Sequence, residues 1–548
     1  MGLIFITGGV ISSLGKGVIT ASIASILEEI GFKVTVLKLD PYLNVDAGTM
    51  NPFEHGEVFV TFDGGETDLD IGHYERFTNI YFSKKNNITS GQIYLSVIEK
   101  ERKGEFLGQT IQFIPHVTNE IKQQIFERTK NYDLGIVEIG GTVGDMESLP
   151  FLEAARQIKI HNPNTIFIHV TYLPFITNTG EIKTKPTQHS VRELRSIGIQ
   201  PDFLILRRDE HSLKMNSNAI QEFKRKVALF SNLTEDKIID VPSQKYTYFI
   251  PYIFLKNKFH KSLLKILFRN KKHAKLINIV NYKESKWTKL RNILLNIRNQ
   301  TKLSVTIVGK YTKLKDSYKS LSEALFHSSI ENNVNLNINW IDSEKIELNR
   351  ELPKSIAASG IIIPGGFGTR GISGKLKVIK WARENNIPIL GICLGLQLMF
   401  IEFCRNVLGI KEADSREFNP NTTIPVVELL ENQKQITKLG GTMRLGNYKC
   451  KILPHTLAYE IYKSQEVEER HRHRYEVNLS FLEQNREKIY QNGLIISGTN
   501  PETNLVEIIE LRNHPFFLGV QFHPEFNSRI FKPHPIFTYF LKIIKNIT

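Results

Sequence analysis

A cysteine in the C-terminal half of the chain lies in a pattern typical of a covalent nucleophile. Gly391-Ile392-Cys393-Leu394-Gly395 follows the apolar run 387–392 and precedes a helix-like stretch at 396–403. This order of strand, sharp turn and helix is the context of a nucleophile elbow, with cysteine in the serine position. The N-terminus of the predicted helix favours the thiolate. The flanking glycines permit the tight turn and argue against a cysteine that is only a small buried side chain.

A base and a group to orient it follow further along the chain. Gln521-Phe522-His523-Pro524-Glu525 comes after an apolar run, and we expect His523 and Glu525 to point to one side of a strand end. A thiol nucleophile needs such a pair. The glycine run Ile363–Gly368 follows another predicted strand, and its backbone N–H groups could bind a carbonyl oxygen as an oxyanion hole.

The N-terminus carries a second reactive pattern, a glycine-rich loop suited to phosphates. Thr7–Gly17 follows the first predicted strand and opens the first predicted helix. In this context the backbone N–H groups and the helix N-terminus point at an anion, and Lys16 can reach its phosphates. The loop is not a strict Walker A motif, because Gly17 stands where a serine or threonine would bind Mg²⁺.

Carboxylates elsewhere must then hold the metal, since Mg²⁺ prefers oxygen ligands. Asp70 lies in a Gly- and Asp-rich stretch, and Glu138 ends a predicted buried strand. The carboxyl ends of parallel strands are where such folds bind ligands. Either residue alone is as readily a strand-end acid or a helix cap, but together with the phosphate loop they favour a metal site.

Alternating strand-like and helix-like segments predict an α/β fold in both halves. Strands are expected at 3–7, 34–39, 134–139, 165–173, 203–206 and 238–241, then at 304–308, 336–341, 360–363, 387–392, 505–511 and 516–522. The stretch 41–114 is too polar for a core layer and is interpreted as a functional insertion. The predicted organisation is a domain at 1–265, a basic linker at 266–300 and a second domain at 301–548.

Composition restricts the class of protein. The chain has 548 residues, 41% of them hydrophobic, and three cysteines, too few for a disulfide framework. We find no signal peptide or membrane span, and expect a cytoplasmic protein without a membrane partner. The net charge of +15 is interpreted as a solvated basic stretch plus nucleotide-phosphate sites, in preference to a nucleic-acid groove.

Long runs of the N-terminal half resemble the amidoligase half of CTP synthases. The cysteine elbow, the His-Pro-Glu motif and the glycine run resemble a class I glutamine amidotransferase domain, and Arg470–Asn478 and Gly440–Gly446 narrow that match to CTP synthases. The N-terminal runs are Thr7–Gly17, Lys38–Tyr42, His55–Val60, Asp68–Phe77, Glu138–Pro150 and Lys183–Ser190. The implied fold is a P-loop-like amidoligase domain with a parallel sheet, fused to an α/β class I glutamine amidotransferase domain.

The resemblance also implies which residues bind each ligand. ATP is expected at Leu14, Gly15, Lys16, Gly17, Val18, Ile19 and Asp70, with its adenine near Ile239, Asp240 and Val241, and Lys38 at the phosphates. Mg²⁺ is expected at Asp70 and Glu138. UTP or the product CTP is expected at Ser13, Asp145, Met146, Glu147, Lys183, Thr184, Lys185, Pro186, Thr187, Gln188 and Lys226. Glutamine is expected at Gly365, Leu394, Gly395, Leu396, Gln397, Glu417 and Arg472, with Cys393, His523 and Glu525 as the catalytic residues.

The implied reaction is the ATP-dependent amination of UTP to CTP through a 4-phosphorylated UTP, with glutamine or ammonia as nitrogen donor. The resemblance further implies GTP activation near the 367–374 loop, feedback inhibition by CTP and a homotetramer. Four departures are peripheral: a longer 207–226 segment, a shorter 426–439 segment, an unusually basic linker and Ser373 where an acidic residue is expected.

Three alternatives remain open at this point. A cobyrinic-acid-type amidotransferase has a similar architecture but amidates carboxylates, and Lys183–Ser190 and Arg470–Asn478 argue against it. A non-catalytic nucleotide-sensing scaffold predicts eroded catalytic residues, whereas these are all present. A nucleic-acid binder predicts salt-sensitive binding to duplexes.

Overall fold

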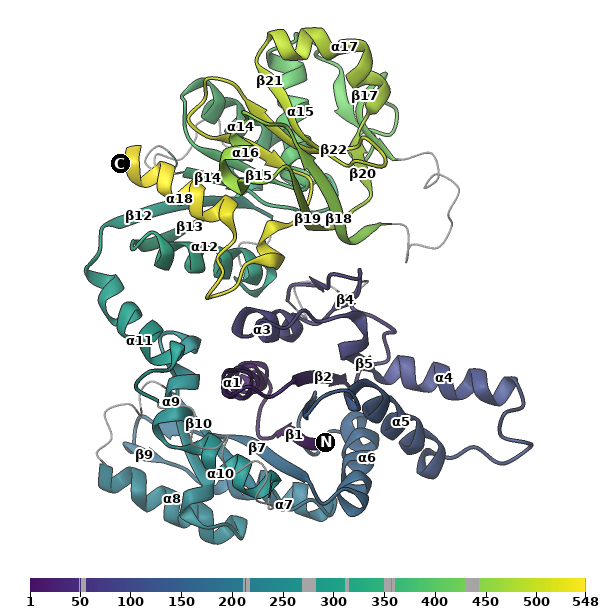
Figure 1. Ribbon diagram of the computed structural model, residues 1–548, viewed down its shortest axis with the longest axis vertical. Coiled ribbons are helices and arrows are strands. Elements are labelled where there is room, and N and C mark those ends of the chain that lie inside the picture. The colour runs from purple at the N-terminus through teal and green to yellow at the C-terminus, as the bar shows by residue number, and fades with distance from the viewer. Residues whose placement is uncertain are drawn as a thin grey trace. The chain divides into compact units, whose positions relative to one another are not determined.

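The computed structural model describes residues 1–48, 50, 56–209, 212, 217–268, 282–310, 315–348, 356, 360–429 and 443–547. The chain forms two compact units, each with its own large β-sheet (Figure 1). The first unit comprises Met1–Ala47 and Asp70–Ile293, and the second comprises Gly48–Leu69 and Leu294–Thr548. The segment Gly48–Leu69 thus belongs to the second unit, whereas the predicted boundaries assign it to the first domain. Residues 269–281 of the predicted linker lie outside the described residues.

The first unit is built on a seven-stranded sheet in the order β11-β10-β7-β1-β6-β2-β5. Every neighbouring pair in it is parallel, which confirms the predicted parallel sheet. The strands are β1 (Gly2–Gly8), β2 (Val34–Asp40), β5 (Asn87–Thr89), β6 (Leu134–Ile139), β7 (Thr165–Leu173), β10 (Phe203–Arg208) and β11 (Ile238–Pro242). A hairpin of β8 (Phe175–Ile176) and β9 (Glu181–Ile182) lies apart from this sheet.

Helices connect the strands of this unit or follow its last strand. They are α1 (Lys16–Ile30), α3 (Leu69–Phe77), α4 (Ser90–Arg102), α5 (Thr118–Thr129), α6 (Leu149–His161), α7 (Lys185–Ser196), α8 (Ser217–Ser231), α9 (Ile250–Lys256), α10 (Phe259–Leu267) and α11 (Lys286–Asn296). Leu3 and Phe5 of β1 pack in one cluster with residues of α5 and α6. Because side chains alternate across a strand, Ile4 and Ile6 face the other side of the sheet from Leu3 and Phe5. Helix α1 contacts the sheet on that side.

The stretch 41–114 is more closely joined to the core than its polarity predicts. β5 forms an edge of the main sheet, and α3 buries Tyr74 and Phe77 completely. Phe77 stacks on Tyr248 and Trp287, with ring centroids 4.6 and 5.5 Å apart. The expectation that this whole stretch lies outside the core layers is therefore wrong.

The second unit has a nine-stranded sheet in the order β13-β12-β14-β15-β23-β22-β21-β18-β19. Its first five strands run parallel and the rest are antiparallel. The strands are β12 (Lys302–Gly309), β13 (Asn335–Asp342), β14 (Gly360–Ile363), β15 (Ile389–Ile392), β18 (Arg444–Ile452), β19 (Glu466–His473), β21 (Leu494–Thr499), β22 (Val506–Leu511) and β23 (Phe517–Val520). Smaller sheets are formed by β3 (Phe59–Val60) with β4 (Glu66–Thr67), and by β16 (Ala413–Ser415), β17 (Ile424–Leu429) and β20 (Tyr475–Val477).

Successive residues of the central strands of this sheet face opposite layers. Ile361 and Ile363 pack with α14 and α15, whereas Ile362 packs with α12 and α18. Figure 1 shows these two helix pairs on opposite sides of β14 and β15. The helices are α12 (Lys319–Glu331), α13 (Ser343–Leu348), α14 (Ile372–Glu384), α15 (Leu394–Asn406), α16 (Leu457–Tyr462), α17 (Leu479–Gln491) and α18 (Pro535–Ile547). Among the described residues, no helix is both long and apolar enough to span a membrane.

Candidate functional site

The glycine-rich loop of the first unit joins β1 to α1 with several residues in the left-handed region. Val10, Ser13 and Gly15 have φ angles of 82°, 57° and 83°. The first turn of α1 contains the predicted ATP residues Lys16–Ile19, and this turn exposes backbone N–H groups that a helix cannot satisfy internally. The Lys16 ammonium donates to the Gly141 carbonyl at 2.6 Å. Burial, reinforced by Lys38, lowers the pKa of Lys16.

A buried cluster of charge lies beside this loop. Lys38 of β2 donates to Glu138 Oε1 of β6 at 2.9 Å and also to Asp70 Oδ2 of α3. The second oxygen of Glu138 accepts bonds from the hydroxyls of Thr20 and Tyr74, at 2.6 and 2.7 Å. Three elements therefore place two carboxylates around one ammonium group.

The three charges shift one another's ionisation. Burial works against the charged form of Lys38, but Asp70 and Glu138 raise its pKa well above the ordinary lysine value. Burial likewise opposes ionisation of Asp70, yet Lys38 and nearby positive groups lower its pKa to about 2. Glu138 is fully buried, and burial raises its pKa although Lys38 acts in the opposite direction.

The carboxylates of Asp70 and Glu138 are oxygen ligands of the kind that Mg²⁺ prefers. The oxygens of Asp70 and Glu138 converge, because both bond the same nitrogen atom of Lys38. A Cβ atom at Gly17 would lie 1.9 Å from Asp70 Oδ1. The Asp70 carboxylate thus occupies the space that the side chain of a Walker A serine or threonine would need, which accounts for glycine at position 17.

The residues predicted to surround adenine lie on β11, the outer strand of the sheet. Asp240 accepts two bonds from Arg208 of β10, whose Nε and Nη2 each donate at 2.8 Å. Arg207 donates to the Leu14 carbonyl at 3.1 Å and to the Val241 carbonyl at 3.0 Å. Arg207 therefore links the phosphate loop to the predicted adenine strand, a role that the sequence reasoning missed. The adjacent residues 210, 211 and 213–216 of the longer 207–226 segment lie outside the described residues.

The predicted UTP residues gather around α7 and the turn that follows β6. Gly144 lies against Glu193 of α7, and Gly9 of the phosphate loop lies against Ser190 of the same helix. Most of the predicted contacts are exposed and so are accessible to a ligand: Ser13, Asp145, Met146, Glu147, Lys183, Lys185 and Lys226. Thr184, Thr187 and Gln188 are instead buried, and Thr187 donates to the Tyr172 carbonyl at 3.0 Å.

Two of these lysines act on the same acid. Lys183 donates to Glu181 at 2.5 Å. The bond to Lys183, together with the more distant charge of Lys226, lowers the pKa of Glu181. Lys183, which follows β9, and Lys226 of α8 therefore both act on Glu181.

The cysteine of the second unit lies in a strained turn between β15 and α15. Cys393 has φ 54° and ψ −104°, a conformation that non-glycine residues rarely adopt and that is typical of functional sites. A Cβ atom at Gly391 would lie 2.4 Å from Met399 Sδ, and one at Gly395 would lie 2.3 Å from the Ile363 carbonyl oxygen. Both flanking glycines are therefore required by close packing of the turn.

His523 and Glu525 lie beside this cysteine. His523 Nδ1 and Glu525 Oε1 are 2.7 Å apart. Burial would lower the pKa of His523, but Glu525 and Cys393 raise it to about 10. The two residues do not share a strand end as expected, because β23 ends at Val520 and Pro524–Asn527 form a 3-10 helix. The turn of this short helix, rather than strand alternation, brings Glu525 to the imidazole.

A cavity of about 100 Å³ contains these groups and two of the predicted glutamine contacts, Gly365 and Arg472. A Cβ atom at Gly365 would lie 2.8 Å from His523 Cε1 and 3.6 Å from Cys393 Cβ. The Arg472 guanidinium lies over the Phe367 ring at 5.3 Å and donates to Glu66 at 2.9 Å. The cavity is lined by Glu57, Val58, Ser317, Tyr318, Leu321, Pro364, Gly365, Gly366, Phe367, Cys393, Arg472, His523, Glu525 and Phe526.

The other predicted glutamine contacts surround this cavity. Glu417 accepts a bond from the Gly368 N–H at 2.8 Å, next to the glycine run. Leu394, Gly395, Leu396 and Gln397 form the first turn of α15. The side-chain amide of Gln397 is buried and donates to the Tyr475 carbonyl at 2.8 Å. This turn can therefore offer backbone N–H groups rather than the Gln397 side chain.

Family comparisons agree with this pair of sites. Residues 2–268 match the model for the CTP synthase N-terminus, and residues 313–543 match the model for class I glutamine amidotransferases. A CTP synthase of Aquifex aeolicus is 52% identical over 541 residues, which cover 98% of this chain and 97% of that protein. A CTP synthase of Methanocaldococcus jannaschii is 50% identical over 545 residues, which cover 98% and 97% of the two chains.

This chain belongs to the CTP synthase family. Matches to CTP synthases cover both units, so the phosphate loop and the cysteine cavity are parts of one family architecture. Family membership confirms the α/β fold with a class I glutamine amidotransferase unit, and it identifies ATP, UTP and glutamine as the small molecules that the family uses.

Several residues of this CTP synthase family member escaped the sequence reasoning. Glu57 and Glu66 belong to the second unit. Glu57 lines the glutaminase cavity, and Glu66 accepts a bond from Arg472. His169 lies within an apolar strand and contacts Thr7 and Ser190 at 2.8 Å each, so it ties β1 to α7. A lone histidine on an apolar strand gave no functional signal. Arg207 and Arg208 stand at the carboxyl end of a predicted strand, and this position could have indicated a role near a ligand.

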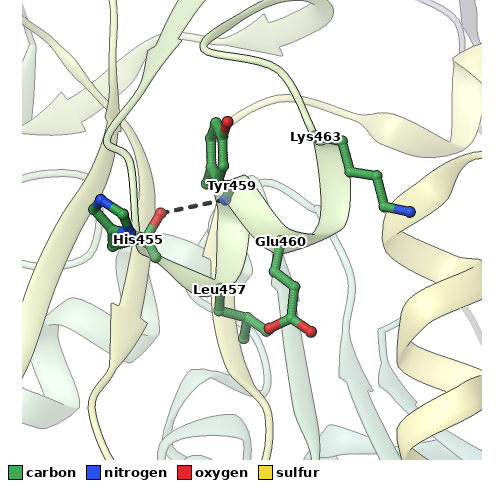
Figure 2. Close-up of a pocket in the computed structure, with 6 residues that line it drawn as sticks. His455, Leu457, Tyr459, Glu460 and Lys463 are labelled. Carbon is green, nitrogen blue, oxygen red and sulfur yellow. Dashed lines mark hydrogen bonds between the residues drawn. The ribbon is translucent and has the colours of Figure 1, made fainter.

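A second cavity among the described residues lies elsewhere. It has a volume of about 610 Å³ and is bordered by α16 and the residues on either side of that helix. Figure 2 shows that the side chains of His455, Glu460 and Lys463 point in different directions. Since these groups do not converge on one point, we assign no chemistry to this cavity.

Proposed function

We propose that this chain converts UTP to CTP, using ATP and the amide nitrogen of glutamine. The observation that carries the proposal is that Cys393, His523 and Glu525 meet at one cavity. The other unit of the same chain places Lys16, Lys38 and two acids beside a phosphate loop. A family relative that is 52% identical along almost the whole chain supports this assignment.

In the glutaminase unit, Cys393 is the nucleophile. Its sulfur attacks the side-chain carbonyl carbon of glutamine, ammonia leaves, and water then hydrolyses the glutamyl thioester to glutamate. His523 transfers the protons in these steps, and Glu525 holds its imidazole by the 2.7 Å contact at Nδ1. The backbone N–H groups of Gly365 and of the first turn of α15 stabilise the oxyanion, while Arg472 and Glu417 bind the amino-acid end.

In the first unit, O4 of the uracil ring takes the γ-phosphoryl group of ATP and ADP leaves. Ammonia then adds at C4 and loses a proton, and the bond between C4 and O4 breaks, so that phosphate leaves with the original O4. Such a transfer depends mainly on positioning and on neutralising charge. Lys16 and Lys38 position the phosphates and neutralise their charge, since each is held by neighbouring groups near the phosphate loop.

Asp70 and Glu138 would hold Mg²⁺, which when bound screens the negative charge of the transferred phosphoryl group. The exposed lysines Lys183, Lys185 and Lys226 bind the UTP triphosphate. Ile239–Val241 contact adenine, and Arg207 fixes this strand to the Leu14 carbonyl.

The finer features of the family are part of the same proposal. GTP activates the enzyme near the 367–374 loop, where Arg370 pairs with Glu344 at 2.9 Å. CTP inhibits it at the uridine site, and the active form is a homotetramer. Three free cysteines are compatible with work in the reducing cytoplasm.

The test is CTP formation from UTP and ATP-Mg²⁺, first with glutamine and then with ammonium chloride. We expect product from both nitrogen sources. Product from ammonia only would place the fault in the glutaminase unit or in the transfer of ammonia. A folded protein that forms CTP from neither source, yet binds both nucleotides, would overturn the enzyme assignment in favour of a nucleotide-sensing scaffold. Hydrolysis of ATP with a carboxylate acceptor in place of UTP would favour an amidotransferase of the cobyrinic-acid type.

A further inference from the structure

A lysine is buried behind the glycine run of the glutaminase cavity. Lys375 lies in α14 with none of its surface exposed, and its ammonium donates to the Pro364 carbonyl at 3.4 Å. The neighbouring buried residues of this helix, Val378, Ile379 and Ala382, belong to the apolar core of the unit. A charged group at such a position costs free energy that an apolar side chain would avoid.

The electrostatic surroundings of Lys375 relate it to the reactive cysteine. Burial and the charge of Lys310 lower the pKa of Lys375 to about 7, whereas Cys393 acts in the opposite direction. Lys375 is therefore within electrostatic range of the sulfur, although it is not among the residues that line the cavity.

The peptide between Pro364 and Gly365 connects the lysine to the cavity. In a trans peptide the C=O and the following N–H point in opposite directions. The Pro364 carbonyl faces Lys375, so the Gly365 N–H faces away from α14. His523 and Cys393 lie close to Gly365, since a Cβ atom there would approach His523 Cε1 to 2.8 Å and Cys393 Cβ to 3.6 Å.

A hydrogen bond to the carbonyl of a peptide also polarises its N–H. Chains of hydrogen bonds strengthen one another inside a protein. An ammonium on the Pro364 oxygen therefore makes the Gly365 N–H a stronger donor as well as fixing its direction. An oxyanion gains more from such a donor than a neutral carbonyl does.

We propose that Lys375 is a positioning residue of the glutaminase reaction, which holds the Pro364–Gly365 peptide so that the Gly365 N–H stabilises the oxyanion formed on glutamine. The inference rests on the proposed glutaminase function of Cys393. Lys375 itself touches neither glutamine nor the sulfur.

The test is Lys375→Met, which keeps an unbranched side chain and removes the charge. We expect kcat for glutamine hydrolysis to fall about tenfold to 100-fold with little change in KM, because the donor acts mainly on the transition state. Alkylation of Cys393 by iodoacetamide, followed by mass spectrometry of its peptide, should keep its wild-type rate, since that displacement forms no oxyanion. The thermal midpoint should stay equal or rise.

Lys380→Met is the matched control, because Lys380 lies on the same helix with an exposed side chain. It should leave every readout unchanged. If Lys375→Met does not fold, Lys375→Leu is a second uncharged replacement and carries the same expectation.

Wild-type kcat in the variant would overturn the proposal. So would an equal slowing of hydrolysis and alkylation, because that result would place the effect on the sulfur or on the integrity of the site. If the wild-type protein itself hydrolyses no glutamine, the proposed function fails together with this inference, and that failure is visible before any variant is made.

Discussion

Gly17→Ala tests the arrangement of the phosphate loop and the proposed metal site. The added Cβ would lie 1.9 Å from Asp70 Oδ1 and 2.6 Å from Asp70 Cγ, where real contacts do not fall below 3.0 Å. The carboxylate must therefore withdraw by at least about 1 Å, the difference between these distances. Such a shift weakens both its contact with Lys38 and its fit to Mg²⁺.

A displacement of about 1 Å in a catalytic group costs roughly 100-fold in rate, or about 2.7 kcal/mol in the activation free energy. We expect CTP formation from UTP, ATP and ammonium chloride to fall by that factor, measured by the change in ultraviolet absorbance as UTP becomes CTP. Alanine is a better helix former than glycine by about 1 kcal/mol. Loss of the helix therefore cannot explain the effect, and glutamine hydrolysis in the absence of nucleotides should be unchanged.

A double-mutant cycle shows whether the effect passes through Asp70. Asp70→Ala alone should abolish synthesis from both nitrogen sources, and adding Gly17→Ala to it should cause no further loss in the affinity for ATP. Wild-type synthesis by Gly17→Ala, or an additional loss of ATP affinity in the double variant, would refute the reasoning.

Three further predictions concern the proposed catalytic triad and the buried histidine. Cys393→Ala should abolish CTP formation from glutamine and preserve formation from ammonia; loss of both in a folded variant would contradict the division of labour. Glu525→Gln should lower kcat for glutamine hydrolysis by about 10⁴-fold. An NMR titration should show the pKa of His523 falling from about 10 toward its ordinary value. The stability that this raised pKa contributes is fully present below about pH 6.5 and is lost as the pH rises through about 10, so denaturant curves of wild type and variant should converge at alkaline pH. Burial lowers the pKa of His169 to about 3, so the free energy of unfolding of the wild type should fall as the pH drops from about 6.5 toward 3. In His169→Phe the free energy of unfolding should depend less steeply on pH, by up to about 1.4 kcal/mol per pH unit. An unchanged slope would show that His169 does not titrate in this way.

The reactive residues that the sequence identified most directly are those whose neighbours along the chain define their geometry. Cys393 was predicted from the glycines beside it, and the structure shows that close packing at Gly391 and Gly395 requires them. The Thr7–Gly17 loop was predicted in the same way, because a strand followed by glycines and a helix forms one continuous piece of backbone. The order of strands and helices in both units follows from the periodicity of apolar residues.

The sequence pattern predicted the role of a residue less well wherever that role depends on partners far along the chain. Asp70 and Glu138 each had an ordinary explanation on their own, and only their shared contact with Lys38 shows that their oxygens converge. Glu525 was predicted beside His523 for the wrong local reason, since a 3-10 helix and not a strand end places it there.

Only the tertiary structure decided where the 56–69 segment lies and what Lys375 does. Glu66 and Arg472 are 406 positions apart in the chain, yet they form a 2.9 Å ion pair within the second unit. Lys375 looks like an ordinary helical lysine in the sequence, and its burial against the Pro364 carbonyl depends on the packing of α14. The sequence by itself determines backbone pattern and the presence of reactive groups, because these depend on neighbouring residues. Burial, charge partners and the ionisation that follows from them depend on contacts between distant segments, which become defined only when the chain has folded.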